Sequence, residues 1–136
     1  MDVKGKRVLV TGGATGYGFG IARVLQRAGA QVWITGRHPE KLASAAAELQ
    51  VRFVRADVAS GADWDRVMET VGDLDVLVNN AGAGGRIAPV AEQRDEDVLA
   101  TINTNLTGVI LGCSRAARSM CRRRGKQLTG VVSGGF

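Results

Sequence analysis

Short apolar runs alternate along this chain with longer segments whose apolar residues recur at helical spacing, and this alternation limits the folds that the chain can adopt. Strands that are separated by helices require right-handed crossovers, so the sheet is parallel and helices cover both of its faces. We therefore predict an α/β fold with a doubly wound parallel sheet. The expected strands span residues 7–11, 31–35, 51–56, 74–79 and 128–132.

The helices between those strands follow from apolar residues spaced three and four positions apart. Gly29 marks the end of the first helix, Pro39 opens the second and Ser60 caps the third. The inward faces that we predict for these helices are Ile21, Val24, Leu25 and Ala28; Leu42, Ala45, Ala46 and Leu49; and Trp64, Val67, Met68 and Val71.

A longer helix is expected from about residue 95 to about residue 120. This spacing places the amide of Asn105 on an apolar face, where it needs hydrogen bonds because an unpaired buried amide costs free energy. The residues predicted to share that face are Val98, Ile102, Asn105, Val109, Gly112 and Ala116.

The length of 136 residues suits one domain with a real core and is too short for two of ordinary size. No apolar run approaches the roughly 20 residues that span a bilayer, and the N-terminus lacks a signal-peptide pattern. We therefore expect a soluble, cytoplasmic protein with no membrane partner. Cys113 and Cys121 fall about 12 Å apart on the long helix, too far for a disulfide, so we expect free thiols in a reducing compartment.

The first predicted strand runs into a glycine-rich loop, Thr11-Gly12-Gly13-Ala14-Thr15-Gly16-Tyr17-Gly18. Glycines permit positive φ and a close approach of the backbone to a ligand, and the following helix directs its positive N-terminus at that ligand. A glycine turn before a helix is common in itself, so its meaning depends on the surrounding alternation of strands and helices. In this context it predicts a phosphate-binding loop.

Four separate segments, each in the expected order and strand context, resemble the short-chain dehydrogenases/reductases. They are Thr11-Gly12-x-x-x-Gly16-x-Gly18, Asp57-Val58 after the third strand, Asn79-Asn80-Ala81-Gly82 after the fourth, and Asn105-Leu106-Thr107-Gly108 in the long helix. Together they cover almost the whole chain. The resemblance implies a Rossmann-type, NADP-binding domain over residues 1–136 and a hydride transfer between nicotinamide and a carbonyl or alcohol substrate.

The resemblance also implies where the cofactor binds. In the family, the residue matching Asp57 meets the adenine ring, and the segment matching residues 79–82 lies along a cofactor ribose while its first Asn ties neighbouring strands together. The alternatives are that Asp57 only caps the following helix and that the two Asn residues form a buried turn network. The residues that we expect to bind the cofactor are Gly12, Ala14, Thr15, Gly16, Tyr17, Gly18, Arg37, Asp57, Val58, Asn79, Ala81 and Gly82.

Cofactor choice rests on the end of the second strand, Thr35-Gly36-Arg37. Folds that prefer NAD place an acidic residue there to accept hydrogen bonds from the ribose 2′-OH. Here that acid is absent and Arg37 offers a bidentate cationic fork to a 2′-phosphate, which predicts NADP. The alternative is that Arg37 is one solvated charge among many. His38, the only histidine, is expected at the entry of the next helix, and no metal site is predicted.

The catalytic residues of the family are matched only in part. In the family a tyrosine exchanges the proton, and a lysine four residues later lowers the pKa of that tyrosine. The only tyrosine here is Tyr17, in the glycine loop, and Ile21 stands four residues after it. Asn105 matches a residue that binds a water of the proton relay, the alternative being a core Asn bonded to backbone, and Ser133 matches the carbonyl-binding serine. The later strands and substrate loop of the family have no counterpart, so we expect a fold truncated after about five strands.

Two functions stay open at this stage. The chain is either the cofactor-binding portion of an NADP-dependent oxidoreductase, which meets a carbonyl or alcohol substrate only when the missing half is supplied, or a non-catalytic nucleotide-binding or interaction protein derived from that fold. The net charge of +5 and the cations at positions 115–126 suggest nucleic acid as a partner. We disfavour that partner because no nucleic-acid motif is present, aromatics are scarce, and cations are favoured near a helix C-terminus.

The predicted fifth strand, residues 128–132, would form a sheet edge with unpaired backbone groups. The long helix around Ile110 and Leu111 would also lack the cover that it has in the complete family fold, which leaves an apolar patch. We therefore expect a homo-oligomer, or dependence on a partner that supplies the missing half.

Overall fold

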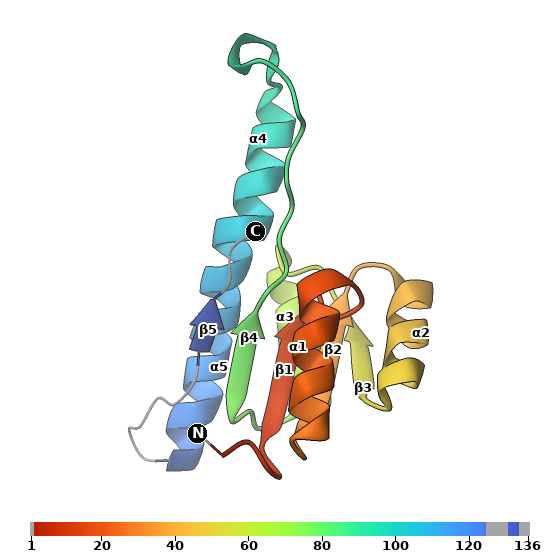
Figure 1. The fold of residues 1–136 in the computed structure, drawn as a ribbon. Helices are drawn as coiled ribbons and strands as arrows, with labels where there is room; N and C mark the ends of the chain where they lie inside the picture. Colours follow the sequence, from red (N-terminus) through yellow and green to blue (C-terminus); the bar gives the residue numbers. More distant parts are fainter. Residues whose placement is uncertain (1, 125–130, 134–136) are drawn as a thin grey trace.

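A parallel sheet of five strands forms the centre of the computed structural model, which describes residues 2–124 and 131–133 (Figure 1). The strands lie in the order β3-β2-β1-β4-β5, so the chain starts in the middle of the sheet and builds outward in both directions. The bounds are β1 Arg7–Thr11, β2 Gln31–Gly36, β3 Arg52–Arg55, β4 Val76–Asn79 and β5 Val131–Ser133. The predicted doubly wound α/β fold is confirmed.

Helices cover both faces of this sheet. The first two helices, α1 (Gly16–Arg27) and α2 (Pro39–Leu49), lie on one face, whereas α3 (Gly61–Val71) and α5 (Gly108–Arg124) lie on the other. The long helix expected from the sequence consists of α4 (Asp95–Ile102), a π-helical turn η2 (Asn103–Thr107) and α5, and a short 3-10 turn η1 (Val90–Glu92) precedes it. In the described part of the chain, every helix is too short or too polar to cross a membrane.

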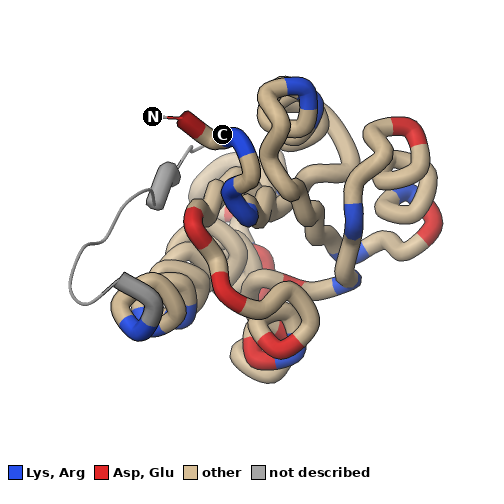
Figure 2. Tube along the Cα trace, turned by 90° about the horizontal axis from the view of Figure 1, so that it is seen from below, with Lys and Arg blue, Asp and Glu red and all other residues tan. Residues whose placement is uncertain are grey.

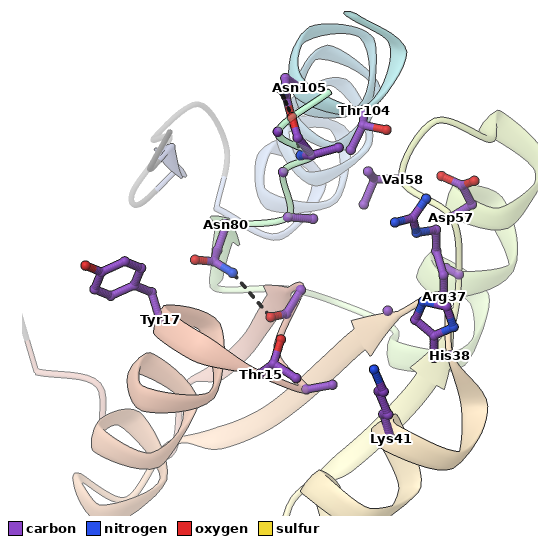
Figure 3. A pocket seen from close by; sticks show the side chains of 18 of the residues that line it. Thr15, Tyr17, Arg37, His38, Lys41, Asp57, Val58, Asn80, Thr104 and Asn105 are labelled. Atoms are coloured by element: carbon purple, nitrogen blue, oxygen red, sulfur yellow. Dashed lines mark hydrogen bonds between the residues drawn. The ribbon is translucent and has the colours of Figure 1, made fainter. Parts of the chain in front are cut away.

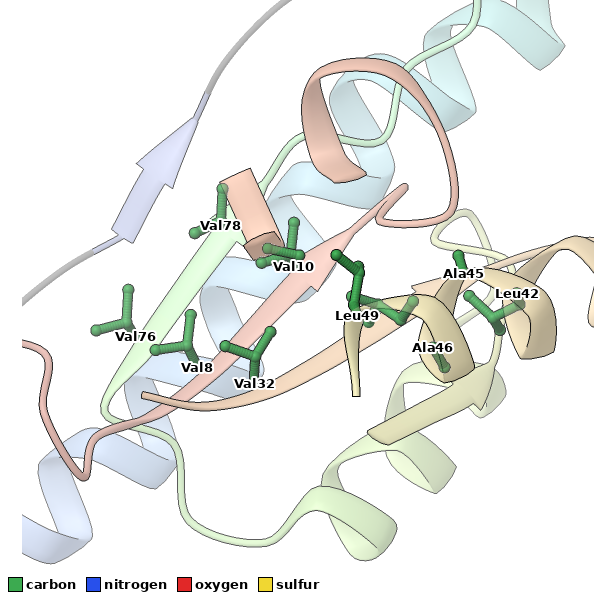
Figure 4. Close-up of a cluster of buried hydrophobic side chains, with 11 residues drawn as sticks. Val8, Val10, Val32, Leu42, Ala45, Ala46, Leu49, Val76 and Val78 are labelled. Atoms are coloured by element: carbon green, nitrogen blue, oxygen red, sulfur yellow. The ribbon is translucent and has the colours of Figure 1, made fainter. Parts of the chain in front are cut away.

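The first core cluster lies between the sheet and the pair α1 and α2 (Figure 4). The inward face predicted for α2 is buried in full. The face predicted for α1 is partly wrong, because Val24 is 67% exposed and Ala28 is also exposed, whereas Ala22 is fully buried. Close approach of α1 to β1 requires small side chains, so Gly18 and Ala22 lie against the sheet and the larger Val24 points outward.

The second core cluster fills the opposite face and is centred on Trp64 of α3. The indole Nε1–H of Trp64 donates to the Val58 carbonyl over 2.9 Å, so its one polar group is satisfied inside the core. A Cβ at Gly112 of α5 would stand 2.6 Å from the indole ring, which explains the glycine there. Ser60 caps α3 as predicted, since its hydroxyl accepts from the Asp63 N–H over 3.1 Å.

Residues 82–102, which we call the arm, extend away from the sheet (Figure 1). Several of its apolar side chains are exposed, and Ile87 and Val90 are almost fully accessible to solvent. We expected Val98 and Ile102 on the same inward face as Ala116, but both are exposed while Ala116 is fully buried. The reason is that α4 extends beyond the sheet and has no buried residue on any face, and the π turn η2 also interrupts the constant helical period that the prediction assumed.

The fifth strand is shorter than predicted and pairs with β4 through Leu77↔Val131, Val78↔Val132 and Asn79↔Ser133. Positions 128–130 of that prediction lie outside the described residues. Of the two helix residues expected to lack cover, Ile110 is 58% exposed, but Leu111 packs against the second core cluster.

Charges of both signs are spread over the described chain (Figure 2). Arg115, the first of the cations considered for nucleic acid, is occupied within the protein, because it pairs with Asp65 over 2.8 Å and donates to the Gly61 carbonyl. Arg118 donates to the Ser114 hydroxyl. The side chains of Arg123, Arg124 and Lys126 lie outside the described residues. Cys113 and Cys121 are both free thiols on α5, as expected.

Candidate functional site

A pocket of about 760 Å³ opens at the carboxyl edge of the sheet (Figure 3). Its lining comes from the loops that follow β1, β2, β3 and β4, together with the π turn and the start of α5. In a doubly wound sheet this is the crevice where ligands bind, and the volume lies within the range of small-molecule sites. The lining residues are Gly12, Ala14, Thr15, Tyr17, Gly36, Arg37, His38, Lys41, Ala56, Asp57, Val58, Asn80, Ala81, Gly82, Ala83, Gly84, Thr104, Asn105 and Val109.

Most of the residues that the sequence singled out lie in this lining, and four do not. Gly16, Gly18 and Asn79 are not among the lining residues, and Ser133 is the fourth. The side chain of Ser133 lies outside the description, although its backbone is the register partner of Asn79. The predicted residues that do line the pocket are Gly12, Ala14, Thr15, Tyr17, Arg37, Asp57, Val58, Ala81, Gly82 and Asn105.

The glycine loop shows why glycine is needed at particular positions. Gly12 has φ +66°, and a Cβ there would stand 3.0 Å from the Cα of Ala81 in the loop after β4. Gly18 begins the buried face of α1, where a Cβ would run into the Gly12 carbonyl oxygen. The third glycine of the motif is therefore a packing residue that lets the helix approach the strand. Tyr17, between them, is 81% exposed at the pocket mouth.

A hydrogen-bond hub at the ends of β1 and β4 holds the loop after β4. The Thr11 hydroxyl accepts from the N–H groups of Asn80 and Ala81, both over 3.0 Å. The Asn80 amide nitrogen donates to the carbonyls of Thr11 and Gly12 over 3.0 and 3.3 Å. Asn80 thus ties the ends of β1 and β4 together. Asn79, to which the family resemblance gives such a tie, is buried, and its amide donates to the Cys113 sulfur over 3.4 Å.

Asp57 combines pocket lining with a local backbone role. Its carboxylate accepts from the Ala59 N–H over 2.9 Å, and its own N–H donates to the Asp63 carboxylate over 2.8 Å. Ser60, not Asp57, is the N-cap of α3. The N–H of Asp57 and the guanidinium of Arg66 stabilise the ionised form of Asp63 and hold its pKa below the ordinary value.

Three basic residues line the pocket after β2: Arg37, His38 and Lys41. His38 is the N-cap residue of α2, as expected of a helix-entry residue, and it also faces the pocket. Sequence reasoning missed Lys41 and could have found it, because it stands four positions after Arg37 in the first turn of a helix that begins at the pocket. Within the described lining, Asp57 is the one acidic residue.

Asn105 differs from expectation because it is exposed and not buried. Its amide oxygen accepts from the Ala83 N–H and its amide nitrogen donates to the Ala83 carbonyl, each over 2.8 Å. Both ends of the amide are therefore engaged by one backbone unit, as in the alternative of an Asn bonded to backbone. This pair of contacts fastens the start of the arm to the π turn.

Comparisons with known proteins agree with this geometry. A family model described as short chain dehydrogenase matches residues 6–134. An oxidoreductase named asL5 from Sarocladium schorii is 40% identical, with the match covering 96% of this chain and 55% of that protein. A 3-beta-hydroxysteroid dehydrogenase from Comamonas testosteroni is 39% identical over 87% of this chain and 48% of its own length.

Solved structures give the same result. A short-chain type dehydrogenase/reductase from Mycobacterium ulcerans superposes with a TM-score of 0.87 at 32% identity, covering 96% of this chain and 52% of that chain. The chain thus spans about half the length of the relatives that it matches.

Proposed function

The chain belongs to the short-chain dehydrogenase family, and from this premise we propose that residues 1–136 form the NADP(H)-binding domain of a cytoplasmic oxidoreductase. The family reaction is hydride transfer between a nicotinamide cofactor and a carbonyl or alcohol substrate. The observation that carries the proposal is the pocket itself, in which a glycine loop stands opposite a basic rim at the carboxyl edge of a parallel sheet.

The described residues fit such a cofactor. Gly12 lines the pocket with a positive φ and packs closely against the loop after β4, and the N-terminus of α1 directs its partial positive charge toward the pyrophosphate position. The adenosine end is assigned to Asp57 and Val58, which follow β3. At the rim, Arg37 presents a guanidinium to the 2′-phosphate that distinguishes NADP from NAD, and the lining after β2 holds no carboxylate that would repel it.

The bound nicotinamide would supply the hydride, and the residues of this chain would bind and orient the cofactor. The hub of Thr11 and Asn80 fixes Ala81 and Gly82 along one wall of the pocket. Asn105 fixes the next residue, Ala83, through both ends of its amide. We therefore assign Asn105 a positioning role through the backbone of the loop, beside the relay role that the family resemblance implies.

Titration with NADPH and NADH tests the cofactor assignment. We expect tighter binding of NADPH, and Arg37→Ala should remove most of that preference. A charge-assisted contact contributes roughly 1.5 to 3 kcal/mol, so the loss should be about tenfold to over a hundredfold in affinity. Arg52→Ala, which removes a charge of the same sign from β3 outside the pocket lining, is the matched control. Unchanged preference in Arg37→Ala would exclude Arg37 as the phosphate ligand.

A second proposal concerns the 136 residues taken by themselves. Within these 136 residues the only tyrosine is Tyr17, at the pocket mouth, and no lysine follows it at the family spacing. We propose that the chain by itself binds the cofactor with little or no carbonyl reduction, because general acid catalysis contributes typically a hundredfold to ten-thousandfold. Robust NADPH oxidation by the purified chain with a simple ketone would contradict this.

We also propose that the chain forms a homo-oligomer. The support is an exposed apolar stripe that runs along one continuous helix from α4 through η2 into α5 and comprises Leu99, Ile102, Leu106 and Ile110. Light scattering over a dilution series should show a mass above that of one chain. A monodisperse monomer at micromolar concentration would refute the proposal.

A further inference from the structure

A continuous chain of polar contacts on the outer surface joins two loops that line the pocket. The Arg55 Nε–H donates to the Arg37 carbonyl over 3.2 Å, and Arg66 donates to the Arg55 carbonyl over 2.9 Å. Arg66 also pairs with Asp63 over 2.9 Å, and the other carboxylate oxygen of Asp63 accepts from the Asp57 N–H over 2.8 Å. The two ends of this contact chain, Arg37 and Asp57, are both lining residues.

The contact chain begins where the backbone hydrogen bonds between β2 and β3 end. The ladder between β2 and β3 ends with the register pair Gly36↔Arg55, and the next contact is the Ala56 N–H donating to the Gly36 carbonyl over 3.0 Å. Arg37 and Asp57 are the next residues along each loop and lie beyond that ladder. The side chains of Arg55, Arg66 and Asp63 continue the connection past the end of the sheet.

Isolated surface ion pairs contribute little to folding stability. The effect of this contact chain therefore depends on how its partners are arranged and not on how many ion pairs it has. Asp63 is only 19% exposed at its side chain and accepts from a backbone N–H as well as from Arg66. The contacts at both ends of the chain are made to backbone groups, which constrains the course of each loop. Bidentate recognition of a phosphate by a guanidinium depends on such alignment.

We propose that Arg55, Arg66 and Asp63 are positioning residues that hold Arg37 at a fixed place relative to Asp57 and thereby determine the preference for NADP over NAD. This inference rests on the proposed cofactor. None of the three lines the pocket, so none is expected to touch the cofactor itself. Their effect is on the geometry with which Arg37 meets the 2′-phosphate.

The first test compares Arg55→Ala with Arg52→Ala. Both substitutions remove one exposed arginine from the same strand, but Arg52 stacks on Trp33 at the end of β3 that is opposite to Arg55. The readout is the ratio of the dissociation constants of NADH and NADPH, measured by calorimetry beside thermal unfolding. We expect Arg55→Ala to lower that ratio about two- to tenfold, the effect of one hydrogen bond, and Arg52→Ala to leave it within about twofold.

The second test uses Asp63→Asn. For this variant, positioning and electrostatics predict opposite changes in the ratio of the dissociation constants of NADH and NADPH. Removing a negative charge near the rim would strengthen binding of the extra phosphate if only the field mattered. Positioning predicts a lower ratio, because the ion pair with Arg66 is lost. A ratio that rises or stays constant in Asp63→Asn overturns the proposal.

Failure of this inference can be told apart from failure of the proposed function. If the unmodified chain does not prefer NADPH, or if Arg37→Ala keeps the preference, then the proposed function fails and this inference fails with it. If Arg37→Ala abolishes the preference and Arg55→Ala behaves like Arg52→Ala, only the positioning inference is wrong. Should Arg55→Ala not fold, Arg66→Ala interrupts the same contact chain from α3 and is judged by the same ratio.

Discussion

The sheet with its flanking helices and the arm are both built from amphipathic sequence, yet only the sheet buries its apolar residues. Leu42 of α2 is fully buried in the first core cluster, whereas Leu99 of α4 is 57% exposed. The spacing of apolar residues predicts a helix in both regions. It does not say whether the partner for the apolar face lies in the same described chain, and for the arm that partner is absent from the described residues.

The largest expected effect is a difference in the free energy of unfolding between a leucine truncation in the sheet region and one in the arm. Leu42→Ala should lower the free energy of unfolding by about 2 to 5 kcal/mol, because it removes buried methyl groups and leaves a cavity. Leu99→Ala should change it by no more than about 0.5 kcal/mol in the monomer, as for other surface positions. Chemical denaturation of both variants measures the difference. Equal losses in dilute solution would show that the arm is as well packed as the sheet.

Glycine substitutions sharpen the comparison. Gly18→Ala should cost about 1 to 3 kcal/mol, because its Cβ would meet the Gly12 carbonyl oxygen and the helix has to move away from the strand. Gly84→Ala in the arm should be neutral or stabilising by about 0.4 to 1 kcal/mol, since a Cβ there meets nothing within 4 Å. Thermal unfolding measures both changes, and Gly20→Ala, in open space on the same α1 helix, is the control for helix propensity.

Asn105 connects the arm to the pocket, so its removal tests whether the two regions are independent. Asn105→Ala should free the Ala83 backbone and cost about 1 kcal/mol or less of local stability, because both hydrogen bonds are near solvent. Hydrogen exchange at the Ala83 amide should become faster while exchange in β1 stays unchanged. Asn105→Asp, which keeps the acceptor and loses the donor, should give an intermediate rate. Slower or unaltered exchange at Ala83 in Asn105→Ala would contradict this role.

The smallest expected effect is on the pH dependence of folding stability, which should have the same sign in the sheet region and in the arm. The Asp57 N–H and the Arg66 guanidinium lower the pKa of Asp63 in the sheet region, and the Arg94 guanidinium lowers the pKa of Asp97 in the arm, each from an ordinary 3.8. Because the folded pKa lies below the unfolded one, this stabilisation is present above about pH 4 and is lost as the pH falls through the folded pKa.

Carboxyl NMR titration measures both residues in one experiment. We expect salt to move the pKa of Asp97 more than that of Asp63, because the main partner of Asp97 is an exposed arginine while that of Asp63 is a backbone N–H. A midpoint above 3.8 for either group would show that its contacts are absent in solution.

The fold could be predicted from the sequence where one helical period runs unbroken. The pattern of α2 identified all four of its buried residues. In α1 the same reasoning favoured Val24, because hydrophobicity ranks valine above alanine, whereas close approach to the strand selects Ala22. Across the long helix the pattern assumed a constant period and a covered face. The π turn at Asn103–Thr107 breaks the period, and neither it nor α4 has a buried residue, so Asn105 is exposed.

The candidate site could be predicted from the sequence at the positions that belong to a recognised motif. Gly12, Asp57 and Ala81 lie at strand ends and line the pocket as expected. The contact chain through Arg55 could not be found in this way, because only the folded sheet brings separate loops together. Lys41 belongs to no motif, although its place four residues after Arg37 at the start of α2 would have indicated it. Whether the lining residues bind NADP stays a prediction.

All described strands end at one edge of the sheet, and this geometry has a consequence for how such a protein changes over evolutionary time. The middle residues of the strands, such as Val8 and Val32, fill the core, while the residues just past the ends, such as Arg37 and Asp57, form the pocket. A mutation that alters the pocket lining therefore leaves the core sequence intact. A lineage can exchange one ligand for another through a few loop substitutions while it inherits the same scaffold.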